Sequence, residues 1–130
     1  MSSKPKVLFW ISSFFTHYAL AYYLQSKLDA DFFGIFEVNL KFKKFIQSQN
    51  LVDFKKTWFY HDYIKNHNQQ IDIEYLRNFE NKNDIGLWNV ALNERYFYKH
   101  NRFYKFQKEE ILSILEDELK LFEQILDESK

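Results

Sequence analysis

An unbroken apolar run near the start of the chain constrains the fold more than any other feature. Residues Val7 to Ile11 read Val-Leu-Phe-Trp-Ile, with no polar residue alternating between them. A short run of this kind is typical of a strand that is covered on both faces, as in a parallel sheet. The sequence therefore predicts that the chain opens on a buried strand of an α/β domain.

A helix and a second strand are expected directly after this run. From about Thr16, a plausible N-cap, the pattern becomes helical, and Leu20, Leu24 and Leu28 recur every four residues as one apolar stripe. A second apolar run covers residues 32–38. Strand, helix and strand within about 35 residues is the size of a βαβ unit, whose crossover is almost always right-handed.

The rest of the chain indicates further helices and one more strand. We expect a helix over 41–49, a strand over 57–60, a polar loop over 61–70, a helix capped by Asp72 and a short helix over 87–92. Residues 109–128 keep helical spacing over about five turns, and Glu116 and Lys120 form an i,i+4 pair in the favoured order. The prediction is one α/β domain over residues 1–130, with a Rossmann-like parallel sheet and flanking helices.

A long amphipathic helix in an α/β protein normally leads back into the sheet, and no strand follows residue 128. We therefore expect the 130 residues to be a fragment of a longer natural chain. A small protein that ends in a helix is the alternative.

Composition excludes several classes of protein. No apolar run approaches the roughly 20 residues that cross a bilayer, and Val7 to Ile11 is too short for a secretory signal, so we expect a cytoplasmic protein without a membrane span. Cysteine is absent, which leaves no disulfide and no thiolate metal site. Eighteen basic and eighteen acidic residues cancel, so the basic excess typical of nucleic-acid binding is missing. Aromatic residues make up 21% of the chain and serve either as stacking platforms for ligands or as core residues.

The loop after the first strand is the first candidate site, because ligands of an open parallel sheet bind beyond the carboxyl ends of its strands. Its polar and aromatic members are Ser12, Ser13, Phe14, Thr16 and His17. The imidazole of His17 is suited to taking a proton from a sugar hydroxyl, although a surface residue of the first helical turn is the alternative. No glycine-rich nucleotide motif follows the strand, which argues against a dinucleotide oxidoreductase or a P-loop kinase.

Two further groups are candidates. His61 and Asp62 follow the expected third strand and would lie at the same edge of the sheet, unless they belong to an ordinary polar loop. Arg95, with Arg77 and Arg102 as further candidates, could bind a phosphate or carboxylate, although surface ion pairing is the more common outcome for such residues. The histidines lack i,i+4 ligand spacing, so no metal site is expected.

Two segments resemble a known family. Residues 6–11 with the helix from Tyr18 to Leu28, and residues 85–95 followed by the long last helix, resemble capsule and surface-polysaccharide biosynthesis proteins. Those proteins look like glycosyltransferases of the GT-B architecture, in which two Rossmann-like halves face a cleft. The resemblance implies that this chain is the N-terminal half, which contacts the sugar or glycan acceptor. It also implies that a missing C-terminal domain holds the nucleotide-sugar donor, with no obligatory metal and no cofactor bound by this part.

The resulting hypothesis is an acceptor-side glycosyltransferase domain that is inactive as an isolated fragment. His17 would be the general base, Ser12, Ser13 and Thr16 would orient the sugar, and Trp10 or Phe14 would shape the floor. One departure from the family pattern is that no glycine-rich turn follows the first strand. The alternative is a non-enzymatic binding or protein-interaction domain, in which the basic and aromatic segment 96–106 could hold single-stranded nucleic acid.

Overall fold

The structure, a computed structural model, describes residues 3–12, 14–64, 70–93 and 106–130. The chain divides into two compact units. Unit 1 comprises Met1–Tyr63 together with Ile125–Lys130, and unit 2 comprises Ile64–Gln124. Two compact units can belong to one domain, so the single domain expected over residues 1–130 stays a prediction.

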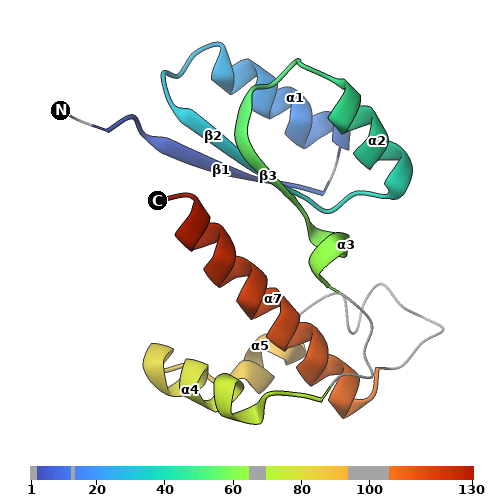
Figure 1. The fold of residues 1–130 in the computed structure, drawn as a ribbon, viewed down its shortest axis with the longest axis vertical. Coiled ribbons are helices and arrows are strands. Elements are labelled where there is room, and N and C mark those ends of the chain that lie inside the picture. Colours follow the sequence, from blue (N-terminus) through green and yellow to red (C-terminus); the bar gives the residue numbers. More distant parts are fainter. Residues whose placement is uncertain (1–2, 13, 65–69, 94–105) are drawn as a thin grey trace. The chain divides into compact units, whose positions relative to one another are not determined.

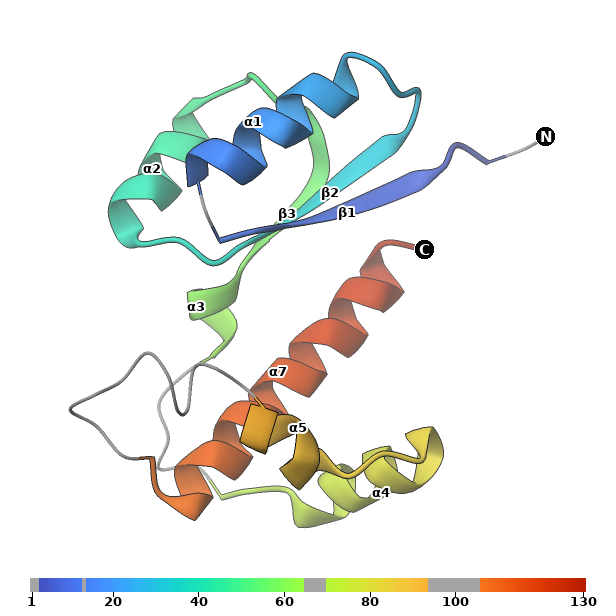
Figure 2. The same ribbon diagram turned by 180° about the vertical axis from the view of Figure 1, so that it is seen from behind.

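Unit 1 contains a three-stranded parallel sheet in the order β1-β2-β3. Its elements, in chain order, are β1 (Lys6–Ile11), α1 (Phe14–Gln25), β2 (Asp31–Phe36), α2 (Leu40–Ser48), β3 (Phe54–Phe59) and the short α3 (Tyr60–Tyr63). Both crossover helices, α1 and α2, cover the same face of the sheet (Figure 1). The view from behind in Figure 2 shows the same arrangement. The predicted Rossmann-like α/β class is therefore confirmed.

The helix-covered face of the sheet carries the core of unit 1. Its buried members are Ile11, Tyr18, Ala21, Phe36, Ile46 and Val52. The Phe36 ring is fully buried and stacks on Phe59 with ring centroids 5.3 Å apart, while Phe54 meets it edge-on at 5.5 Å. These three phenylalanine rings therefore serve as core packing under α1 and α2.

The opposite face of the sheet is only partly covered. Phe33 stacks on Trp58, which is 1% exposed and donates its indole N–H to Glu128 Oε2 over 2.8 Å. Leu8 and Trp10 of β1, by contrast, are 46% and 38% exposed. The prediction that this first strand is buried on both faces is wrong, because β1 pairs only with β2 among the described strands and exposes this side at the sheet edge.

Helix α1 also differs from expectation. It begins at Phe14, so Thr16 lies inside the first turn and is not the N-cap. The leucine stripe is wrong as well, because Tyr18 and Ala21 are buried whereas Leu20 and Leu28 are 49% and 46% exposed. The reason is that α1 is apolar on every side, so that four-residue spacing of leucines does not identify the face that packs on the sheet.

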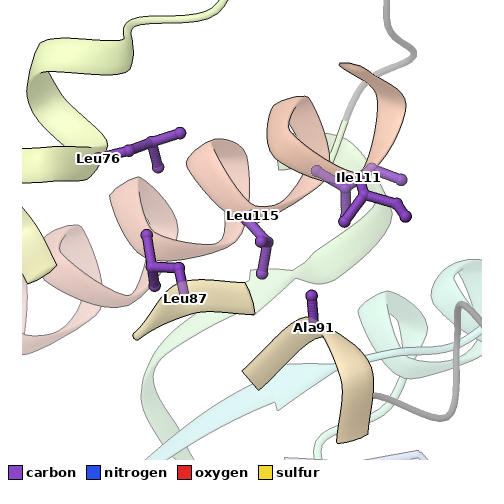
Figure 3. Close-up of a cluster of buried hydrophobic side chains, with 6 residues drawn as sticks. Leu76, Leu87, Ala91, Ile111 and Leu115 are labelled. Carbon is purple, nitrogen blue, oxygen red and sulfur yellow. The ribbon is translucent and has the colours of Figure 1, made fainter. Parts of the chain in front are cut away.

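Unit 2 is helical among its described residues. Its helices are α4 (Ile73–Asn83), α5 (Leu87–Asn93) and α7 (Lys108–Glu128), the last turn of α7 belonging to unit 1. Figure 3 shows how side chains from these helices meet in one core, whose buried members are Leu76, Leu87, Ala91, Ile111, Ile114 and Leu115. No described helix of either unit combines the length and apolar character that a membrane span requires.

Several predicted local features of the chain are confirmed. Asp72 caps α4 by accepting a hydrogen bond from the backbone N–H of Tyr75 over 2.9 Å. Lys120 pairs with Glu116 at 2.6 Å, as the i,i+4 spacing predicts. The polar loop expected over 61–70 is wrong at its start, because β3 continues directly into α3.

Candidate functional site

The three strands of unit 1 end at one edge of the sheet. β1, β2 and β3 end at Ile11, Phe36 and Phe59, and the backbone N–H of Glu37 donates to the carbonyl of Ile11 over 2.9 Å. This edge is where parallel α/β sheets bind ligands, because the loops that leave the strands gather there. The residues that follow the strands therefore define the candidate site.

Three side chains link the strand ends, and we call them the strand-end cluster: Trp10, Glu37 and Tyr60. The indole N–H of Trp10 donates to Glu37 Oε2 over 3.0 Å. The Trp10 ring also packs at a tilt against Tyr60, with centroids 5.7 Å apart. Tyr60 is buried, Glu37 is half-buried and Trp10 is exposed. The cluster thus offers solvent an aromatic surface beside a carboxylate.

A lysine from α2 reaches the same edge. Lys43 Nζ lies 2.6 Å from Asp62 Oδ2 and 4.9 Å from the centre of the Phe59 ring. His61, the other residue of the predicted His61–Asp62 pair, lies edge-on against Tyr60 at 5.3 Å. Because Asp62 balances the charge of Lys43, this group suits a neutral hydroxyl-bearing ligand better than a phosphate.

His17 closes the loop that leaves β1. Its Nδ1 accepts the backbone N–H of Ser12 over 3.2 Å. A neutral imidazole that accepts at Nδ1 carries its proton on Nε2, so the N–H of Ser12 engages the lone pair of this ring. In this contact His17 is the hydrogen-bond acceptor. Its predicted role as general base requires release from Ser12 and stays a prediction.

The remaining predicted residues are not all brought together. Thr16 lies exposed in the first turn of α1, one residue from His17. Arg77 lies exposed on α4 in unit 2. Ser13, the side chain of Phe14, Arg95, Arg102 and all but the last residue of segment 96–106 lie outside the described residues.

Sequence reasoning missed Glu37 and Lys43 and placed Tyr60 inside a strand. The expected strand over 32–38 ended too late, which concealed that Glu37 is the first residue after β2. Aligning the ends of the three predicted strands would have found this carboxylate, since parallel strands finish at a common edge. No signal in the sequence pairs Lys43 with Asp62, because that contact depends on how α2 packs.

Charged groups in the described part of the chain do not form a metal centre. Among these residues, no three His, Asp or Glu side chains gather closely enough to hold a metal ion. Comparison of the chain with known protein families, with characterised proteins and with solved structures found no match. Membership of the capsule-polysaccharide family therefore stays a prediction, and the function has to be inferred from the site itself.

Proposed function

We propose that unit 1 is the acceptor-side half of a sugar-transferring enzyme and binds a glycan acceptor at the strand-end cluster. The observation that carries the proposal is the exposed indole of Trp10, fixed by Glu37 and Tyr60 at the ligand-binding edge of a Rossmann-like sheet. Capsule or surface polysaccharide synthesis belongs to this proposal through the sequence resemblance, and a cytoplasmic location is part of the same proposal.

The chemistry of a sugar matches the chemistry of this edge. A pyranose has an apolar C–H face, which stacks on aromatic rings, and hydroxyl groups around its rim, which need both donors and acceptors. Trp10 supplies an aromatic face, and Glu37 supplies an acceptor beside it. His17 and Ser12 stand at the exit of the same strand, where a sugar hydroxyl can be bound.

The same edge is a poorer match to the nucleotide part of a donor. No glycine-rich turn follows β1, and the nearby Lys43 is engaged by Asp62. We therefore assign the nucleotide-sugar donor to a second, C-terminal half of the enzyme. Transfer then needs a base for the acceptor hydroxyl, and His17 is the candidate once Ser12 releases its Nδ1.

The proposal is tested by following the three tryptophan indole N–H signals in NMR spectra of the intact chain. Trp10 and Trp88 are almost equally exposed, at 38% and 41%, but Trp88 lies in unit 2 and so serves as a matched control. Trp10→Phe and Trp88→Phe assign the signals. Titration with neutral oligosaccharides is expected to shift the Trp10 signal and leave the Trp88 signal in place.

Two variants sharpen this experiment. Glu37→Gln keeps the size of the side chain but removes the charge of the acceptor, so it should weaken saccharide binding by roughly tenfold. Glu74→Gln, at an exposed position of α4, should not change saccharide binding. A Trp10 signal that stays unmoved by every neutral saccharide, or that moves only with nucleotide sugars, would reject the acceptor assignment.

A further inference from the structure

Helix α1 of unit 1 carries an apolar surface that its own core does not use. Between Phe14 and Gln25 the helix contains no charged residue. Its exposed side chains include Phe15 at 76%, Tyr22 at 54% and Tyr23 at 58% exposure, and Leu20 at 49%. From Tyr22 round to Leu20 these positions span an arc of about 160° on the helix. Exposed apolar side chains that gather on one side of a helix in this way are typical of an interaction site.

A groove deepens this surface where α1 meets α2. It has a volume of about 400 Å³ and is lined by Phe15, Tyr18, Ala19, Tyr22, Phe45 and Leu51. None of these side chains is charged, and the most polar atoms among them are the two tyrosine hydroxyls. The groove therefore suits hydrocarbon rather than a polar ligand.

The charged residues of helix α2, beside the groove, have one sign. Helix α2 carries Lys41, Lys43 and Lys44 and no acidic residue. Lys43 pairs with Asp62, whereas Lys41 and Lys44 are exposed, and Lys41 lies one helical turn from groove residue Phe45. At the other end of α1, Lys27 stands 5.7 Å from the Tyr23 ring centre. A partner that matches this face would be apolar where it meets the groove and anionic around it.

We propose that the α1–α2 face docks onto an anionic membrane surface. Lysines beside an apolar and tyrosine-rich surface are the combination that holds peripheral proteins at an anionic leaflet. An acidic amphipathic helix would fill the groove but leave Leu20 and Tyr23, on the far side of the arc, uncovered. A bilayer interface adapts to side chains that project from a convex helix and covers the whole arc. This inference does not depend on the proposed glycan site.

Vesicle co-sedimentation of the intact chain tests the inference. Vesicles of phosphatidylcholine mixed with phosphatidylglycerol should bind the protein, vesicles of phosphatidylcholine alone should bind it at least tenfold more weakly, and added salt should release it. Lys41→Glu combined with Lys44→Glu should weaken binding at least tenfold, since each lysine near an anionic leaflet contributes roughly fivefold. Phe15→Ser combined with Leu51→Gln should weaken it to a similar degree.

Matched variants on other parts of unit 1 distinguish binding through this face from non-specific adsorption to vesicles. Leu8→Gln removes from β1 a leucine that is 46% exposed, against 54% for Leu51, and Lys6→Glu reverses the charge of a lysine at the start of that strand. Both should bind vesicles nearly as the original chain does, and circular dichroism checks that every variant is folded. The inference is overturned if anionic vesicles do not bind the chain or if the groove variants bind them unchanged. It is also overturned if Phe15→Ser instead dissociates a dimer in sedimentation velocity, which would assign the face to a second copy.

Discussion

Helices α1 and α7 contribute to buried cores in very different ways. Helix α7 is amphipathic, with Ile111, Ile114 and Leu115 buried in the core of unit 2 and charged residues along its outer side. Helix α1 has no charged residue, and among its described side chains, those of residues 15–25, only Tyr18 and Ala21 are members of the buried core of unit 1. The difference shows that apolar residues of α7 mainly stabilise the fold, whereas several of α1 face solvent and are available for binding.

The strongest test of this difference truncates one aliphatic side chain on each helix and compares the loss of stability. Ile114→Ala should lower the free energy of unfolding by about 2–5 kcal/mol, because Ile114 is 1% exposed and its removal leaves a cavity. Leu20→Ala should change it by less than about 0.5 kcal/mol, because Leu20 is half exposed. Urea denaturation followed by circular dichroism measures both. Equal losses would mean that α1 is as deeply packed as α7.

The packing beneath α1 is tested at Gly34 of β2. A Cβ at this position would lie 2.8 Å from Phe36 Cε2 and 3.2 Å from Phe54 Cε1. The fully buried Phe36 ring is held between Phe54 and Phe59 and has little room to withdraw, so Gly34→Ala should cost about 1–3 kcal/mol.

Gly86 is the matched control for this substitution. There an added Cβ would meet only the amide end of Asn89, 3.1 Å away, which is the far end of a flexible side chain. Gly86→Ala should therefore cost clearly less in the same urea titration. If both glycine variants are equally stable, the sheet under α1 is looser than its aromatic contacts indicate.

On the α7 side, a buried carboxylate ties the helix to the start of α4. Glu116 is 9% exposed and accepts hydrogen bonds from the backbone N–H of Asp72 over 3.0 Å and from Lys120 over 2.6 Å. Glu116→Ala leaves that backbone N–H without this acceptor and should cost about 1–3 kcal/mol. Asp127→Ala removes an exposed pair with Lys130 from the same helix and should cost about 0–0.5 kcal/mol. Similar losses for the two variants would contradict a special role for Glu116.

The smallest expected effect depends on pH. Burial, and then the hydrogen bond that the phenol donates to Glu123, raise the pKa of Tyr75 above its usual value. In the unfolded chain the phenol loses its proton at a pH of about 10, so the stability that its folded environment provides is complete below this pH and is lost above it. Tyr75→Phe should cost about 1 kcal/mol near neutral pH.

The same variant should also make the loss of stability above pH 10 shallower than in the original chain. The pKa values of Lys120, through its bond to Glu116, and of Tyr18, through burial, are raised too, so part of the slope should remain. Urea midpoints measured between neutral and alkaline pH provide the comparison. Parallel curves for the two proteins would show that Tyr75 ionises as freely in the folded chain as in the unfolded one.

The same contrast explains what could be predicted from sequence. The long helix over 109–128 was found almost to the residue, because its polar side makes the helical period visible. The βαβ unit was found for a similar reason, since apolar runs and turn residues alternate. The buried side of α1 could not be found, because a helix that is apolar all round has no period to reveal which face packs.

The position of the candidate site could be predicted from the sequence, but several of the residues that form it could not. Knowing that parallel sheets bind ligands at their carboxyl ends was enough to select Ser12, His17 and His61. It was not enough to find the bond from Trp10 to Glu37, because the two residues are 27 positions apart and meet only when β1 and β2 are in register. Likewise, the tautomer of His17 follows from its bond to Ser12, which no spacing rule predicts.

The strand order β1-β2-β3 also has a consequence for how the chain acquires its structure. Each strand pairs with the next one in the sequence, so each pairing closes only a short loop and can form as soon as the next strand leaves the ribosome. The bond from Trp58 to Glu128 joins residues 70 positions apart and needs the chain as far as Glu128. Unit 1 is thus expected to pair its strands early during synthesis and to complete its packing around Trp58 last.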